Sequence, residues 1–511
     1  MATIVGAKGG ANESLFELKE DVSNSPLWNE DLAPVPIAKR NWTTYNFAAL
    51  WVSMAHCIPT YMLASGLISK GMNWWQALMT ILLGNAIVLI PILLNSHPGT
   101  KYGIPFPVFA RASYGTYGSN LPAIMRAVVA CGWFGIQAWI GGQAIHLFLR
   151  ALFPGWPTLL GGPIQTSIIA GYTPTEYISF LIFWGINIFI VYRGMNLLRK
   201  VENWAAPFVL IMAAVLVVWA VTKANGLGAI MEAKNNFASF SDFMKVFAPM
   251  LTAMIGFWAT LSLNMPDFTR FGRSQREQVV GQVVALPTTM TVFSAMGVVI
   301  TSAAMIIYPK MNPGDVWDPV KLVGQFSQAW LVAISMFTIV VATLSVNIAA
   351  NVVSPANDFA NAFPKWISFK TGGLLTGILG ILIQPWRLLA DADKYFGYLG
   401  TYSGGLGSIA GVLIVDYWII RRKELRVADL YKTQGSYTYA GGWNWWAVVA
   451  TLLGCAFAWG GLVFKPLKPL YDYAWFVGLF VSGLSYYLFM KAGKAACYKP
   501  LSPNESAFRK Q

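Results

Sequence analysis

The chain has 511 residues, of which 56% are hydrophobic and 11% charged, and its mean hydropathy is +0.52. Soluble globular domains carry about 25% charged residues, so this composition excludes a water-soluble protein and indicates a polytopic membrane protein. The formal net charge of +14 comes from short basic clusters between apolar stretches, a pattern of membrane orientation rather than of nucleic-acid binding. The four cysteines form no CxxC pair, so we expect neither a disulfide framework nor a zinc site.

The sequence predicts an all-α polytopic membrane protein with twelve transmembrane helices. A membrane helix takes about 20 mostly apolar residues. Stretches that meet this criterion lie at 44–69, 74–95, 122–152, 177–193, 203–223, 248–268, 280–307, 325–352, 371–389, 396–420, 443–464 and 471–491. The expected organisation is a cytoplasmic N-terminal tail (1–42), a transporter core (43–420), a cytoplasmic loop (421–440), helices eleven and twelve (441–491) and a cytoplasmic C-terminal tail (492–511).

Basic residues alternate between the two ends of these spans. Clusters precede span one and follow spans four, six and ten, whereas opposite loops such as 153–176 are poorer in Lys and Arg. The positive-inside rule therefore predicts that both termini are cytoplasmic, in a multi-pass protein of the plasma membrane. Residues 1–40 contain no apolar segment of the kind that a signal peptide carries.

Two spans contain helix-breaking residues. In the stretch SMAHCIPTY of span one, Pro59 removes a hydrogen-bond donor and clashes with the carbonyl of Ala55. Span six carries Asn264, Pro266 and Asp267. Paired interruptions five spans apart predict an inverted-repeat transporter, with one repeat at about 43–223, a second at about 248–420 and two helices appended.

Spans three and eight occupy corresponding places in the two predicted repeats, and both are polar at their centres. On span three, Trp133 and Gln137 are four residues apart and share a helix face, which suits a flat ligand with hydrogen-bonding edges. Asn347 and Asn351 share a face on span eight in the same way. The alternative interpretation is structural. In it, Trp133 is an ordinary packing residue, and the amides form hydrogen bonds between helices worth about 0.6 kcal/mol each.

Several stretches resemble the nucleobase–cation symporter-1 family, which carries nucleobases, allantoin, hydantoins and some vitamins. They are GTKYGIPFPVFARASYG, PDFTRF, NIAANVVSPAND, QPWRLL, and VDYWIIRRKEL followed by DLY. The resemblance extends from about residue 27 to 490. It implies a LeuT-like fold of five-plus-five inverted repeats with two further helices.

The resemblance also implies a substrate site. The family's ring-sandwiching tryptophans match Trp133 and Trp258, with Phe257 beside the latter, and its ring-reading amides match Gln137 and Asn351. Offset stacking favours aromatic rings, and unpaired buried amides select hydrogen-bonding ones. His56 and Cys57 occupy the span-one positions where hydantoin-type and allantoin-type members carry other residues. The resemblance therefore does not fix which substrate is carried. GWFGIQAWIGGQAI and NIAANVVSPAN are most similar to members that carry uracil and purines.

The coupling ion is expected to be sodium or a proton, and no other cofactor is expected. The family's sodium site matches carbonyls of Ser53, His56 and Ala342 and the hydroxyl of Ser345, but its next hydroxyl is replaced by Val346. Valine supplies no side-chain oxygen, which weakens sodium binding and favours a proton. The proton candidates are Asp267 and His56, because ionisable groups at membrane depth are functional by default. Pairing of Asp267 with Arg270 is the structural alternative.

The function that follows is cation-coupled import of a heterocycle by alternating access, with no enzymatic activity. The expected partners are the small-molecule substrate and the lipid bilayer, with no nucleic acid and no obligate protein partner. The first alternative is an intramembrane enzyme using His56 and Cys57; adjacent helical residues point about 100° apart, which disfavours their contact. A channel, and a same-fold transporter of a different heterocycle such as a vitamin, are further alternatives.

Overall fold

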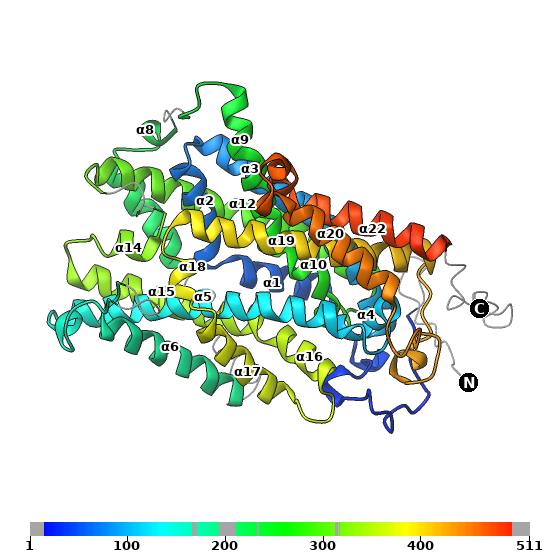
Figure 1. The fold of residues 1–511 in the computed structure, drawn as a ribbon. Helices are drawn as coiled ribbons and strands as arrows, with labels where there is room; N and C mark the ends of the chain where they lie inside the picture. Colours follow the sequence, from blue (N-terminus) through cyan, green and yellow to red (C-terminus); the bar gives the residue numbers. More distant parts are fainter. Residues whose placement is uncertain are drawn as a thin grey trace.

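The computed structural model describes residues 15–165, 171–193, 211–231, 235–311, 315 and 317–492, and within them the chain is helical apart from two isolated β-bridges. Helices run roughly parallel along one long axis (Figure 1). The described part contains nine spans long and apolar enough to cross a membrane. They are α3 (Trp74–Tyr102), α5 (Asn120–Leu152), α6 (Pro174–Arg193), α9 (Phe240–Ala259), α12 (Gln275–Ile307), α15 with α16 (Ala329–Asn351, Val353–Ala362), α19 (Ala392–Ile414) with the π-helical turn η4 (Val415–Ile420), α20 (Trp445–Val463) and α22 (Ala474–Ala492).

A tenth span is the bent pair α1 (Thr44–Ala55) and α2 (Ile58–Ser69). Two shorter apolar helices, Ile211–Lys223 and α17 (Phe369–Leu382), lie where spans five and nine are predicted. The predicted start of span five, 203–210, lies outside the described residues, as does most of the predicted C-terminal tail. The polytopic all-α class is confirmed, and the twelve predicted positions all carry a helix.

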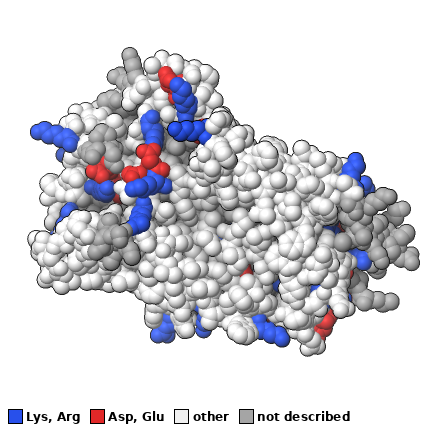
Figure 2. All heavy atoms as spheres, viewed as in Figure 1, with Lys and Arg blue, Asp and Glu red and all other residues white. Residues whose placement is uncertain are grey.

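Lipid-facing surface lies between two charged ends. Figure 2 shows a broad uncharged middle, with Lys, Arg, Asp and Glu gathered mainly toward the two ends of the long axis and along the lower edge of the view. Large apolar side chains point outward from the spans, among them Ile90, Phe189, Val449 and Phe480, each more than a third exposed. Exposed apolar side chains on long helices fit a hydrocarbon solvent rather than water.

The predicted break in span one is present. The path of the chain bends by 58° between α1 and α2. Since Pro59 has no N–H, the Ala55 carbonyl instead accepts from Cys57 N–H at 3.0 Å. Thr60 N–H donates to Cys57 O at 3.1 Å. In a continuous helix Cys57 and Thr60 would bond Ser53 O and His56 O, so both of these carbonyls lose their helical donors.

Span six is interrupted less than the sequence predicts. It divides into α9, α10 (Leu261–Asn264) and α11 (Pro266–Thr269), but the junction residues Thr260 and Met265 keep right-handed helical dihedrals. Pro266 stands at the first position of α11, where a missing N–H costs little. The two breaks therefore differ: span one bends sharply, whereas span six keeps a nearly helical path.

One end of the molecule gathers the loops that the basic clusters predict to be cytoplasmic. The N-terminal segment 15–43 crosses this end, near α4 (Phe106–Tyr114; Figure 1). Arg40 is 3% exposed and donates to backbone carbonyls of Phe16, Val35, Thr100 and Lys101 at 2.8–3.3 Å. Burial lowers the pKa of Arg40 to about 10, so it stays charged at neutral pH. The segment is thereby fixed to the end of α3.

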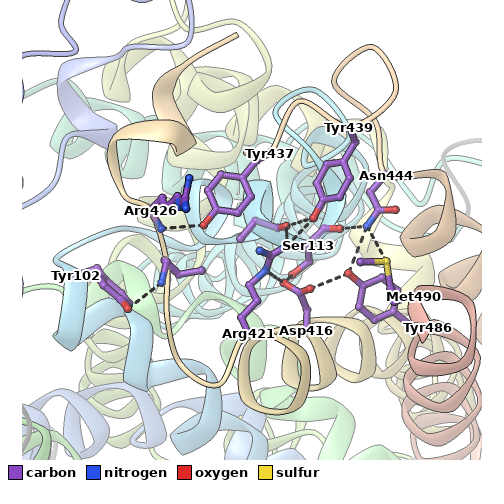
Figure 3. Close-up of polar contacts among 12 residues, drawn as sticks. Tyr102, Ser113, Asp416, Arg421, Arg426, Tyr437, Tyr439, Asn444, Tyr486 and Met490 are labelled. Atoms are coloured by element: carbon purple, nitrogen blue, oxygen red, sulfur yellow. Dashed lines mark hydrogen bonds and ion pairs between the residues drawn. The ribbon is translucent and has the colours of Figure 1, made fainter. Parts of the chain in front are cut away.

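The VDYWIIRRKEL stretch has a structural role at the same end. Asp416 in η4 forms an ion pair with Arg421 at 2.6 Å and accepts from Tyr486 OH at 2.8 Å and Ser113 Oγ at 3.0 Å (Figure 3). Arg421 also donates to Ala112 O at 2.8 Å. This buried cluster joins α4, α19 and α22, so the motif anchors helices rather than contacting the central cavity described next.

Candidate functional site

Most of the predicted substrate residues meet at one closed cavity. It lies where the α1–α2 break faces α5, α9, α10 and α15, and its volume is about 20 Å³. A single water needs about 10–15 Å³, so no heterocycle fits without rearrangement. The lining residues are Met54, Cys57, Trp133, Gln137, Phe257, Trp258, Thr260, Leu261, Val346, Ala350 and Asn351. We call this the central cavity.

The aromatic side chains of the central cavity lie edge to face. The Phe257 ring lies 5.2 Å from Trp133 and 4.8 Å from Trp258, nearly perpendicular to both. Phe257 thus contacts the rings of both tryptophans. Trp133 is fixed by its Nε1–H, which donates to Tyr402 OH at 3.1 Å, and Tyr402 OH donates to Gly256 O at 2.8 Å.

Two polar atoms of the central cavity are buried without a partner in the described part of the chain: the Gln137 Oε1 acceptor and the Trp258 Nε1 donor. An unpaired buried polar group costs about 1–3 kcal/mol. Asn351 is partly engaged, since its Nδ2 donates to Asn347 Oδ1 at 3.0 Å. Asn347 in turn donates to Asn187 Oδ1 at 3.2 Å. The central cavity therefore offers a free acceptor and a free donor beside aromatic rings.

His56 does not line the central cavity with the other predicted substrate residues. It lines a larger, mainly apolar cavity of about 420 Å³, where its ring stacks on Phe293 at 4.3 Å. Cys57 lines both cavities, and its Sγ lies 3.3 Å from Thr60 Oγ1. The two side chains thus have different partners, and neither forms a nucleophile–base pair with the other.

The residues of the predicted cation site fit a cation in part. The break frees the carbonyls of Ser53 and His56, as described above. On α15, Ser345 Oγ donates to Ala342 O at 3.1 Å, which brings these two predicted ligand oxygens together. Val346 presents hydrocarbon to the central cavity instead of an oxygen. The predicted ligand oxygens that α15 can supply are therefore those of Ser345 and Ala342.

Asp267 is buried, with 2% of its surface exposed, and its Oδ1 accepts from Phe106 N–H at 2.9 Å. Arg270 interacts electrostatically with Asp267, in line with the structural alternative, and its guanidinium donates to Asp31 O at 2.9 Å. Arg126 and Asp358, a fully buried ion pair 3.5 Å apart, interact electrostatically with Asp267. The sequence analysis missed this pair because its members lie far apart in the chain.

Residues 34–478 match the family model described as permease for cytosine/purines, uracil, thiamine and allantoin. The chain belongs to this family. It is a membrane transporter and not an enzyme, which confirms the resemblance to the nucleobase–cation symporter-1 family. An allantoin permease of Bacillus subtilis (strain 168) is 42% identical over 93% of this chain and 96% of its own. A purine-uracil permease of Arabidopsis thaliana is 38% identical over 94% of this chain and 79% of its own.

Solved structures give the same fold. The symporter Mhp1, in a closed conformation with bromovinylhydantoin bound, superposes with a TM-score of 0.73, at 25% identity over 94% of this permease and 99% of Mhp1. A Na⁺-coupled sialic acid symporter superposes with a TM-score of 0.61 at 12% identity, over 91% of this permease and 92% of that chain. The permease therefore has the predicted LeuT-like fold, and its structural neighbours include a sodium-coupled transporter.

Proposed function

We propose that this permease imports a neutral cyclic ureide or nucleobase across the plasma membrane, with allantoin as the first candidate and uracil as the second. Both termini lie in the cytoplasm in this proposal. The order of candidates follows the 42% identity to an allantoin permease and the 38% identity to a purine-uracil permease. Ureides and nucleobases share a planar edge of alternating N–H and C=O groups.

The observation that carries the proposal is the pair of unpaired atoms in the central cavity. Gln137 Oε1 needs a donor and Trp258 Nε1 needs an acceptor, and a ureide edge supplies both. The rings of Trp133 and Trp258 provide apolar faces for the flat ligand. A substrate without N–H groups would leave Gln137 Oε1 unpaired, so the site selects against it.

Substrate entry requires the central cavity to open, because about 20 Å³ holds no ring. Phe257 contacts both tryptophan rings, and in this proposal its side chain moves first. In LeuT-like transporters a rocking of one helix group against the other exposes the midplane site alternately to each side. The closed central cavity is an intermediate of that cycle in this proposal.

Coupling to a cation takes place at the α1–α2 break in this proposal. A cation held by the freed carbonyls of Ser53 and His56 and by Ser345 on α15 would tie the break to α15. Val346 provides no oxygen there, so we expect a sodium gradient alone to be a poor driving force. A proton gradient is then the main driving force, with Asp267 or His56 as the proton carrier in place of these oxygens.

The test is uptake into proteoliposomes with imposed gradients of sodium or protons. A panel of labelled allantoin, uracil, hydantoin, adenine and guanine ranks the substrates. We expect saturable, proton-dependent accumulation of allantoin, with uracil next. Flux that does not saturate would instead indicate a channel, and accumulation driven by sodium alone would refute the weak sodium site.

A further inference from the structure

A second polar cavity lies farther along α5, toward the end opposite the N-terminal segment (Figure 1). Its volume is about 320 Å³, within the range of small-ligand pockets. We call it the outer cavity. It is enclosed by α2, α5, the start of α6 and the segment around α14 (Pro319–Val323), and it shares no lining residue with the central cavity.

The outer cavity is lined by α5, the same helix that lines the central cavity. Gln143 and His146 lie six and nine residues beyond Gln137 on α5, which is about 9 and 14 Å along the helix axis. A ligand in the outer cavity would therefore lie about 9–14 Å along the helix axis from the level of Gln137. The covering segment is fixed in place, since Ser65 Oγ of α2 donates to Trp317 O at 2.7 Å.

Two side chains of the outer cavity carry unpaired buried atoms. Among the described residues, Gln143 Nε2 and His146 Nδ1 have no hydrogen-bond partner, and His146 is 6% exposed. The His146 ring also interacts with the backbone of Thr175 and with the carboxylate of Glu176. The amide nitrogen is a donor, and the imidazole nitrogen donates or accepts according to its tautomer. Such groups at the wall of an empty space indicate a ligand with hydrogen-bonding edges.

The remaining wall suits a neutral ring. Met62, Trp139, Ile140, Leu147 and Leu389 supply its apolar part. The Trp139 ring is held edge-on by Tyr172 at 4.9 Å and is 3% exposed. A flat molecule with apolar faces and polar edges matches this combination.

The charges of the outer cavity do not favour an ion. Lys321 pairs with Asp315 at 2.6 Å, and Arg150 donates to Gly324 O at 3.1 Å. Glu176 accepts from Thr173 N–H at 2.6 Å, and Asp318 Oδ1 accepts from Val320 N–H at 2.9 Å. Burial raises the pKa of Asp318.

We infer that the outer cavity is a second binding site for the same neutral ureide or nucleobase, filled before the central cavity opens. This inference rests on the proposed function for the chemistry of its ligand. Gln143 and His146 hold the polar edge of the ring, and Trp139 packs against it. The outer site raises the local concentration of substrate at the closed central cavity, so its loss weakens uptake at low substrate more than at saturation.

The test measures equilibrium binding of radiolabelled allantoin and of uracil to the purified full-length protein, and uptake by the same variants. We expect two molecules per wild-type chain, and one per chain for Gln143→Leu and for His146→Phe. These variants should raise the KM for uptake about three- to tenfold, the range of one lost hydrogen bond, with Vmax within about twofold. Phe148→Leu, on the same helix but outside the cavity lining, is the matched control and should bind two.

Trp133→Ala separates the two proposals. It should keep one binding event, at the outer cavity, while losing uptake. If wild type binds one molecule, Trp133→Ala binds none and Gln143→Leu equals wild type, the outer site is refuted and the central site stands. If wild type binds neither allantoin nor uracil, the proposed substrate class fails and the inference fails with it.

Discussion

Replacing Gln137 by leucine separates a binding role from a structural one. Gln137 Oε1 is buried and unpaired in the closed cavity, at a cost of about 1–3 kcal/mol. Leucine has similar size and no polar atom, so Gln137→Leu should leave the thermal midpoint of unfolding unchanged or raise it. Substrate binding should weaken, because a hydrogen bond worth about 0.5–1.5 kcal/mol is lost. The KM for allantoin uptake then rises about two- to tenfold.

Asn347→Leu is the matched comparison. Asn347 bonds Asn351, Asn187 and the carbonyl of Phe134 at 3.0–3.4 Å. Its removal takes the donor from Asn187 Oδ1 and the acceptor from Asn351 Nδ2, so the thermal midpoint should fall. Uptake in proteoliposomes and thermal unfolding in detergent are measured on both variants. A destabilised Gln137→Leu with normal uptake would refute the assignment, since Gln137 would then be a packing residue.

Three further variants test the cation site and the anchored end. Val346→Thr adds a hydroxyl beside Ser345 and should let a sodium gradient alone drive uptake; equal sodium responses in wild type and variant would contradict this. Asp416→Asn leaves the buried Arg421 charge unpaired and should destabilise the protein by about 3–5 kcal/mol, read as a lower thermal midpoint; an unchanged midpoint would contradict it. Arg40→Lys keeps the charge but loses the planar donor fork, so the N-terminal segment should be cleaved faster by trypsin; cleavage at the wild-type rate would contradict it.

Local rules were enough to predict the break in span one. Pro59 removes one specific hydrogen bond, so its position fixes where the helix fails. The same rule overstated the break in span six, because Pro266 stands at the start of a helical turn and keeps its dihedrals. The sequence does not show whether a proline falls at the start or the interior of a turn when the flanking residues remain helical.

Contacts between distant segments could not be predicted in the same way. The polar face of Trp133 and Gln137 follows from helical spacing, and both line the central cavity. His56 is adjacent to Cys57 in sequence, yet the bend turns it toward Phe293 and away from that cavity. Thr260 was missed, although a polar residue two positions after Trp258 was a usable signal. Gln143 was visible as a polar residue, but the α14 segment that completes its cavity lies far along the chain.

The most direct test of the central claim is an experimental structure of this permease with allantoin bound. The central cavity has room for about one water, so a bound ring requires Phe257 to move. We predict density for the ring between Trp133 and Trp258, with its edge at Gln137 and Phe257 displaced. A ring found only in the larger apolar cavity beside His56 and Phe293 would contradict the account.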